Sequence, residues 1–334
     1  MNNEAPLLSV HDLSVSFDTD NGVVAAVSHF SYTLRQGETL AIVGESGSGK
    51  SVGALAVMQL VPDPPGRITS GHIDFRDRNL LDLDEREMRK IRGNDIAMIF
   101  QEPMTSLNPV LTIGEQIAEA VQLHQGFDKT KARARSLEML QLVQLTEPER
   151  RLDQYPHELS GGMCQRVMIA MALACTPSIL IADEPTTALD VTIQAQILDL
   201  MRDIKDRLGT AILLITHDLG VVAEMADRVL VVYAGRKVEE APVRDLLQAP
   251  RHPYTRGLLG AMPRLGGSNR QERLTEIPGT VPSLAEPIAG CAFAARCSMA
   301  IEQCRREAPA LERYGDSEHY AACWRSGDLG GADT

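Results

Sequence analysis

An eight-residue glycine pattern constrains this chain more than any other feature. It lies between an apolar run that reads as a strand and a segment, 52–60, that reads as a helix; its residues are Gly44, Glu45, Ser46, Gly47, Ser48, Gly49, Lys50 and Ser51. A strand, a glycine loop and a helix in this order form a phosphate site, because backbone N–H groups and the positive end of the helix converge on an anion. Lys50 is expected to reach the β- and γ-phosphates, and Ser51 to bind Mg²⁺. The spacing favours a nucleoside triphosphate site over an ordinary glycine turn.

Length and composition set limits on the class of protein. With 334 residues and 44% hydrophobic side chains, the chain can form one large domain and a smaller one. A net charge of −12 argues against a broad nucleic-acid surface, although it also serves solubility. No apolar run reaches the roughly 18 residues of a membrane-spanning helix, and residues 1–4 lack the pattern of a signal peptide. We therefore expect a cytosolic chain whose six cysteines are thiols or metal ligands.

Strands alternate with helices after the glycine pattern, which predicts an α/β fold with a mostly parallel sheet. The first segments, 7–17 and 23–34, read as strands of an N-terminal β part, and 103–109 reads as a loop. Helical periodicity between 114 and 143 indicates a helical insertion, at about 103–175, between two strands of the sheet. Further strands are expected at 96–100, 178–182 and 211–215, helices at 163–174 and 193–208, and a hairpin at 229–239.

Polar side chains follow several of these strands where each one ends. Gln101, Asp183 with Glu184, and His217 hold such positions, together with Lys50. Because the carboxyl ends of parallel strands share one edge of a sheet, these groups are expected to line one pocket. There Asp183 would hold the metal through water, and Glu184 would deprotonate the attacking water. His217 and Gln101 would sense the γ-phosphate and the metal, and the metal and Lys50 would stabilise the transferring phosphoryl group.

A second glycine segment opens a helix about 110 residues after the first. It consists of Ser160, Gly161 and Gly162, and it can be an anion site or simply a serine-capped helix with small packing residues. One triphosphate has little need for two such sites in one subunit. The two sites could serve one nucleotide if they belong to facing subunits.

In this order the motifs resemble those of the ATPase subunits of ATP-binding cassette (ABC) transporters over roughly residues 7–260. Residues 44–51 match the Walker A loop, Gln101 the Q-loop, Leu159 to Gly162 the signature motif, Ile179 to Glu184 Walker B, Ala188 to Asp190 the D-loop, and His217 the switch histidine. By this resemblance Phe17 stacks on the adenine of ATP. One departure concerns Met163, where the family favours Gln, while Gln165 stands two places further on.

The resemblance also implies an assembly. Two ATPase subunits would pair head to tail around two ATP molecules, and their closure would drive two transmembrane permease subunits. The segment from Pro103 to Asn108 is a candidate contact with the permease. The second ATPase subunit is expected to be a paralogue, and a solute-binding protein would complete the complex on the outer side. The chain would then lie at the cytoplasmic face of the inner membrane.

The C-terminal part narrows the resemblance. Arg251 to Thr255, Gly257 to Leu259 and Ile277 to Pro282 resemble the extension of dipeptide and oligopeptide importers, most of all the D-type subunit of dipeptide permeases. We predict a nucleotide-binding domain at 1–265 and an extension at 266–334, joined by the flexible linker Gly266 to Ser268. Relatives of this family also carry nickel, glutathione and other solutes, so the cargo stays open. A soluble DNA-associated ABC ATPase is a rival, but the negative charge and the lack of a long coiled coil disfavour it. A P-loop GTPase would need an Asn-Lys-x-Asp motif, which is absent.

Four of the six cysteines gather in the extension. Cys291, Cys297, Cys304 and Cys323 are separated by five, six and eighteen residues. Such a segment is too small for its own core, so a bound metal would stabilise it. Zinc sites usually show closer cysteine pairs, whereas iron–sulfur clusters also take four thiolates. The spacing favours a [4Fe–4S] cluster, with zinc or free thiols as alternatives. The resemblance to the peptide-importer family implies the same cofactor, because related extensions look built for such a cluster. Cys164 and Cys175 are expected to be small packing residues.

Overall fold

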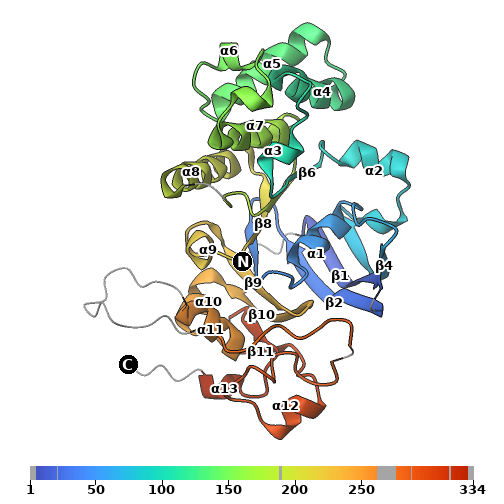
Figure 1. The fold of residues 1–334 in the computed structure, drawn as a ribbon, viewed down its shortest axis with the longest axis vertical. Helices are drawn as coiled ribbons and strands as arrows, with labels where there is room; N and C mark the ends of the chain where they lie inside the picture. The colour runs from blue at the N-terminus through green and yellow to red at the C-terminus, as the bar shows by residue number, and fades with distance from the viewer. Residues whose placement is uncertain are drawn as a thin grey trace, which may run out of the picture. The chain divides into compact units, whose positions relative to one another are not determined.

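The computed structural model describes residues 5–20, 22–187, 190–261, 276–286, 288–315 and 317–329 (Figure 1). The predicted linker and domain boundary near 265 lie outside these residues. The chain divides into two compact units, each described by itself. The helical unit comprises residues 1–7, 34–39 and 79–215, and the phosphate-loop unit comprises residues 8–33, 40–78 and 216–334.

The phosphate-loop unit contains two groups of strands. An antiparallel group has the order β2-β1-β4-β5, and β1 faces β4 in a register that pairs Val10 with Ile73 and Phe17 with Gly66. The group β11-β12-β10-β9-β3 is mixed, because β3 and β9 are parallel while β9, β10, β12 and β11 are antiparallel. These strands are β1 (Leu8–Thr19), β2 (Gly22–Leu34), β3 (Thr39–Val43), β4 (Gly66–Phe75), β5 (Arg78–Asn79), β9 (Arg228–Tyr233), β10 (Arg236–Pro242), β11 (Glu312–Arg313) and β12 (Tyr320–Ala321).

Short helices complete this unit. They are α1 (Lys50–Val57), α9 (Leu219–Met225), α10 (Val243–Gln248), α11 (Pro253–Gly260), α12 (Glu302–Arg306) and α13 (Ser326–Leu329). Every residue of β3 and β9 is buried, as expected for parallel strands covered on both faces. Residues 277–297 pack on the core that contains β9 and Tyr254, and β12 adds to β10. The extension therefore contributes strands and core to this unit.

The helical unit holds the parallel strands β6, β7 and β8, with Ile96 opposite Ile179 and Ile179 opposite Ala211. Its strands are β6 (Ile96–Ile99), β7 (Ile179–Asp183) and β8 (Ala211–Thr216), the last of which ends at the unit boundary. Its α-helices are α2 (Glu85–Ile91), α3 (Pro103–Ser106), α4 (Ile113–Gln125), α5 (Lys129–Leu142), α6 (Pro148–Arg151), α7 (Gly161–Leu173) and α8 (Val191–Leu208), with 3₁₀ turns at Leu80–Asp82 and Pro156–Glu158. Along the chain, α3 to α7 lie between β6 and β7, and Figure 1 shows α4 to α7 grouped close together.

Local sequence signals explain where these helices begin and end. Thr112 and Glu115 form a capping box at the start of α4, and Gly126 ends it in the left-handed conformation. Asp190 caps α8, which Gly209 ends in the same way. The predicted loop at 103–109 is partly wrong, because α3 forms there. Pro103 stands at the first turn, where proline is tolerated, so this breaker starts a helix of one turn.

Candidate functional site

The phosphate loop, residues 44–51, joins β3 to α1. Gly47 and Gly49 have φ of 76° and 94°, in the left-handed region that favours glycine. A Cβ added to Gly49 would lie 2.2 Å from the carbonyl oxygen of Ala26, and one added to Gly44 would lie 2.2 Å from that of Val232. The backbone of the loop therefore makes a tight turn next to β2 and β9, as the sequence predicted.

The ammonium group of Lys50 lies inside this loop. Its side chain donates to the carbonyl oxygens of Gly44 at 2.8 Å and Glu45 at 2.9 Å, and the residue is only 6% exposed. The turn between β9 and β10 supports the loop from outside, because Gly235 donates its N–H to the carbonyl of Ser48 at 3.0 Å. The positive charge of Lys50 is therefore held within the backbone of the phosphate loop, an arrangement that suits the binding of phosphate oxygens.

Three other predicted residues, Phe17, Ser51 and His217, lie in the same unit. Phe17 lies half-buried near the end of β1, and its ring packs over Gly66 so closely that a Cβ there would lie 2.7 Å from it. His217 is exposed directly after β8, and Asp218 caps α9 by accepting from Gly220 at 2.8 Å. Ser51 is half-buried in the first turn of α1.

In the helical unit, Glu184 follows the buried Asp183 at the end of β7. Its carboxylate Oε2 accepts hydrogen bonds from Gln101 Nε2 at 3.1 Å and from Thr187 Oγ1 at 2.9 Å. Its backbone N–H donates to Ile215 at 2.9 Å, and its φ is 47°, a conformation that is rare for a residue with a side chain. Such local strain is typical of residues whose side chain must point in a set direction. The structure thus brings Gln101 and Glu184 together, as predicted.

The second glycine segment lies at the start of α7. Ser160 is its N-cap and accepts from the N–H of Met163 at 3.4 Å, while Gly161 is exposed. Gly162 packs against α8, because a Cβ there would lie 3.0 Å from Ile193. Gln165 is 2% exposed and donates to the carbonyl of Pro185 at 2.6 Å. It therefore ties α7 to the loop after Glu184, and it does not replace the polar group missing at Met163.

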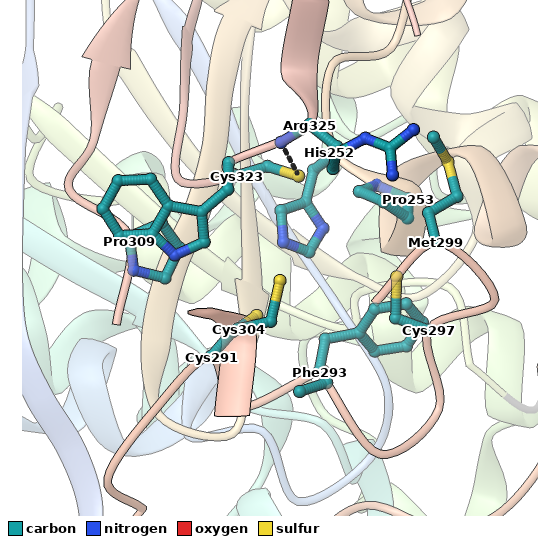
Figure 2. A pocket seen from close by; sticks show the side chains of 12 residues that line it. His252, Pro253, Cys291, Phe293, Cys297, Met299, Cys304, Pro309, Cys323 and Arg325 are labelled. Carbon is teal, nitrogen blue, oxygen red and sulfur yellow. Dashed lines mark hydrogen bonds between the residues drawn. The ribbon is translucent and has the colours of Figure 1, made fainter. Parts of the chain in front are cut away.

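The four cysteines of the extension line one pocket together with His252 and Phe293 (Figure 2). Burial is the main reason why the pKa of the Cys291 thiol rises to about 11, and the neighbouring Cys304, Cys323 and Cys297 raise it further. Burial likewise raises the pKa of Cys297 and Cys323. Thiols that are kept protonated by burial ionise more readily when a cation binds beside them.

The tautomer and the charge of the His252 ring in this pocket follow from its surroundings. Its Nδ1 accepts the N–H of Tyr254 at 3.1 Å, so a neutral ring carries its hydrogen on Nε2. Burial lowers its pKa to about 4, so the ring is neutral at physiological pH. Figure 2 shows the imidazole among Cys323, Cys304 and Cys297.

Comparison with known proteins shows which family this chain belongs to. The family profile described as ABC transporter matches residues 27–187, and that described as oligopeptide/dipeptide transporter, C-terminal region, matches residues 238–304. The chain is 57% identical, over 97% of its length and 96% of the relative's, to a probable peptide ABC transporter ATP-binding protein, y4tR, of Sinorhizobium fredii. The chain belongs to the ATP-binding subunits of ABC transporters.

Two further comparisons agree with this assignment. The oligopeptide transport ATP-binding protein OppD of Bacillus subtilis is 53% identical over 95% of this chain and 88% of that protein. A dimeric ATP-binding cassette, MJ0796, solved in a post-hydrolysis state with ADP and Pi, superposes with a TM-score of 0.64 at 30% identity and covers 71% of this chain and 99% of its own. The predicted α/β cassette fold and the ATPase class are confirmed. In the described part of the chain, no helix has the length and hydropathy to span a membrane.

Not every predicted feature of this ABC ATPase can be placed. Of the D-loop, Ala188 and Leu189 lie outside the described residues, while Asp190 accepts from Ile193 at 3.0 Å as the cap of α8. Cys164 and Cys175 are buried, at 0% and 5% exposure. Among the residues that the structure describes, no three His, Cys, Asp or Glu side chains are grouped so that they could hold a metal ion. The predicted iron–sulfur cluster, and zinc as its alternative, are therefore not confirmed.

Three polar contacts were not predicted from the sequence. Thr187 helps to orient Glu184, and Arg296 and Tyr254 both contact Glu45 of the phosphate loop. The sequence did indicate that Glu45 has a positively charged partner, because a carboxylate within a phosphate loop has to be neutralised by a nearby cation. Nothing in the sequence pattern pointed to Arg296 as that cation, because it lies 251 residues away.

Proposed function

We propose that this chain is the ATP-hydrolysing subunit that energises import of dipeptides and oligopeptides through a membrane permease. The family supports the ATPase role, and the matched C-terminal region together with the names of the relatives supports a peptide cargo. The observation that carries the proposal is the carboxylate of Glu184, oriented by Gln101 and Thr187 directly after β7. A carboxylate held in this way can accept a proton from an attacking water.

The roles of the other residues extend this proposal. Phe17 stacks on adenine, and residues 44–51 bind the phosphates with Lys50 at the β- and γ-groups. Ser51, Gln101 and Asp183 would hold Mg²⁺, Asp183 through water. Bound Mg²⁺ supplies positive charge to the phosphate oxygens. His217 contacts the γ-phosphate. The cradle around Lys50 and the position of Asp183 at the end of a buried strand support these roles.

Replacement of the proposed base tests the hydrolytic role. Glu184→Gln keeps the shape of the side chain but removes its basicity, so ATP binding should persist while turnover falls by about 100-fold or more. Glu149→Gln, an exposed change on α6, is the matched control and should hydrolyse ATP normally. Undiminished hydrolysis by Glu184→Gln would refute the assignment.

We further propose that residues 160–162 bind the ATP held by a second ATPase subunit, a paralogue. The exposure of Ser160 and Gly161 at the start of the 13-residue helix α7 supports this role. Gly161→Asp places a negative charge at this helix start without a clash, since nothing lies within 4 Å of an added Cβ. In the Glu184→Gln background, ATP should pair the parent chain with its paralogue, as measured by light scattering, and Gly161→Asp should abolish pairing. Paired Gly161→Asp chains would contradict the proposal.

For the four-cysteine pocket we propose a [4Fe–4S] cluster with a structural role. A single zinc ion holds four sulfurs about 3.8 Å from one another, given Zn–S bonds of about 2.3 Å, whereas a cluster places its irons and sulfides between the thiolates. Four cysteines that line one pocket match the number of thiolates that such a cluster takes. The cluster would link the segments that carry the four cysteines.

Purification without oxygen tests the cofactor. The protein should be brown, absorb near 400 nm and contain about four irons and four sulfides per chain, and Cys304→Ser should remove them. Cys164→Ser changes a buried cysteine outside the pocket and should retain the iron. Colourless protein with one zinc per chain would overturn the proposal.

We propose residues 1–265 as the nucleotide-binding domain and 266–334 as its extension, docked on two permease subunits at the cytoplasmic face of the inner membrane. A solute-binding protein delivers the cargo. The permease contact is proposed at 103–108, which is flanked by the exposed side chains of Phe100 and Val110, 40% and 75% exposed.

Copurification in detergent with two permeases, and loss of that complex in Val110→Asp, would support the docking site. The exposed change Val191→Asp on α8, where the side chain is 83% exposed, is the control. Uptake of labelled dipeptides by cells that carry the complete transporter tests the cargo, and uptake of nickel or glutathione alone would contradict it.

A further inference from the structure

The phosphate loop contains a carboxylate, Glu45, at its second position. A negative charge so close to a triphosphate site opposes binding unless it is neutralised. Its two oxygens accept hydrogen bonds from Arg296, with Nη1 to Oε2 at 2.7 Å and Nη2 to Oε1 at 3.0 Å. This bidentate pairing of guanidinium and carboxylate is the strongest geometry that the two groups can form.

Every N–H group of the Arg296 guanidinium donates a hydrogen bond. Besides Glu45, it donates Nε to the carbonyl of Pro278 at 2.9 Å, Nη1 to the hydroxyl of Tyr233 at 3.3 Å, and Nη2 to the carbonyl of Ile277 at 3.3 Å. The five N–H groups of a guanidinium are thus all engaged. The side chain is 7% exposed, and its guanidinium carbon lies 5.7 Å from the ring centroid of Tyr233. The hydrogen bond to Glu45 is the main reason why the pKa of Arg296 is raised, so its charge is permanent.

The backbone of Glu45 is held from the same side. Its N–H donates to the hydroxyl of Tyr254 at 2.8 Å, and Tyr254 is fully buried on α11. The rings of Tyr233 and Tyr254 meet edge to face at 4.7 Å. Both the side chain and the backbone of Glu45 are therefore fixed by one aromatic cluster that also carries Arg296.

We propose that Arg296 is a positioning residue of the phosphate loop, which neutralises Glu45 and thereby sets the affinity for ATP. This inference rests on the proposed role of residues 44–51 as the ATP site. It gives the extension a defined effect on the cassette: without Arg296, the carboxylate repels the triphosphate and the start of the loop loses its anchor.

The same contact links ATP affinity to the four-cysteine pocket. Arg296 directly precedes Cys297, and its N–H donates to the carbonyl of Phe293 at 3.0 Å, so the turn that lines the pocket also places the guanidinium. If the four cysteines lose the group that they bind, the turn that carries Arg296 is therefore displaced and the ion pair with Glu45 is broken. The ATP site responds to the state of the pocket through the charge of Glu45.

A double-mutant cycle on the full chain tests this inference, with the dissociation constant of MgATP as the readout. Arg296→Met should weaken binding about tenfold, because it leaves a partly buried carboxylate unpaired. Glu45→Gln should bind within about threefold of the parent, and Glu45→Gln with Arg296→Met should match Glu45→Gln. Arg306→Met, which removes a surface pair with Glu302 in the same extension, is the control and should change nothing. Parental affinity in Arg296→Met, or a double variant as weak as Arg296→Met, would overturn the inference.

Two measurements separate this inference from its premises. Amide hydrogen exchange without nucleotide should speed up at residues 44–49 in Arg296→Met, a result that does not depend on what the loop binds. If the parent chain binds no MgATP, the proposed function fails, while the exchange experiment still decides the contact. Cys304→Ser should weaken MgATP binding in the parent but not in Glu45→Gln; equal weakening in both backgrounds, or none in the parent, would overturn the link to the pocket.

Discussion

Two carboxylates of this ABC ATPase each contact a side chain from the C-terminal extension, yet their surroundings differ. Glu45 of the phosphate loop is 28% exposed and pairs with Arg296. Glu239 of β10 is fully buried, and His319 Nε2 lies 2.7 Å from it. Glu239 also accepts the N–H groups of Arg251 at 2.6 Å and His252 at 3.0 Å.

The difference separates a contact that maintains the fold from one that adjusts function. Glu239 satisfies backbone donors that have no access to water, so its loss must cost stability. Glu45 lies next to a ligand-binding loop and keeps access to solvent, so its pairing changes the local charge more than it changes the fold. Variants of both regions should therefore divide into those that lower stability and those that lower ATP affinity.

The largest effect is expected from Glu239→Ala. It leaves His319 and two buried N–H groups without their acceptor, which should lower the free energy of unfolding by ~3–5 kcal/mol. Urea denaturation measures this, and Glu312→Ala, an exposed change on β11, should cost less than ~0.5 kcal/mol. The folded fraction of Glu239→Ala should bind MgATP normally; a stable variant with poor ATP binding would reverse the comparison.

A change in the phosphate loop itself comes next. In Gly49→Ala the new Cβ meets the carbonyl of Ala26 at 2.2 Å with φ at 94°, so we expect a loss of ~2–4 kcal/mol in unfolding free energy together with loss of ATP binding. Gly47→Ala is the matched control, because it shares the positive φ but has open space around it; it should cost only ~1 kcal/mol. Equal costs at the two positions would mean that backbone strain, rather than the close approach to Ala26, makes the loop rigid.

Removal of the histidine from the buried pair should have a smaller effect. His319→Ala deletes one hydrogen bond but leaves Glu239 with its two backbone donors, so we expect a loss of ~1–3 kcal/mol. His319→Gln can still donate from a similar position and should recover about half of that loss. Thermal unfolding of the three proteins checks this order, and a His319→Gln variant less stable than His319→Ala would contradict it.

What the sequence could predict depended on how far apart the interacting residues are. The phosphate loop is one contiguous segment, so its glycine spacing alone was enough. Gln101 and Glu184 could be placed together because both follow strands of one parallel sheet. The pairing of Arg296 with Glu45 has no such rule behind it: it depends on how residues 277–297 pack on β9.

One local prediction, the loop at 103–106, was wrong, and another, the cofactor of the four cysteines, stays a prediction. Both outcomes have physical reasons. The segment at 103–106 was taken as a loop because proline and asparagine break helices, but proline is well suited to a first helical turn. The four cysteines do line one pocket, as their clustering suggested. Their occupant could not be derived, because thiolates serve several metals and spacing alone does not choose among them.

The smallest effect is expected from an ion pair that shares the geometry of Arg296 but not its burial. Arg133 donates to both oxygens of Asp153, at 2.8 and 2.9 Å, with side chains 55% and 65% exposed. Arg133→Gln should therefore change the unfolding free energy by less than ~1 kcal/mol and leave ATP affinity unchanged. Hydrogen bonds from Arg133 lower the pKa of Asp153, so the contribution of the pair is present at neutral pH and is lost as the pH falls below about 4. Denaturation at pH 7 and pH 3 measures both values. A large effect at pH 7 would show that bidentate geometry alone stabilises the fold, and the contrast between Glu45 and Glu239 could then no longer be attributed to burial.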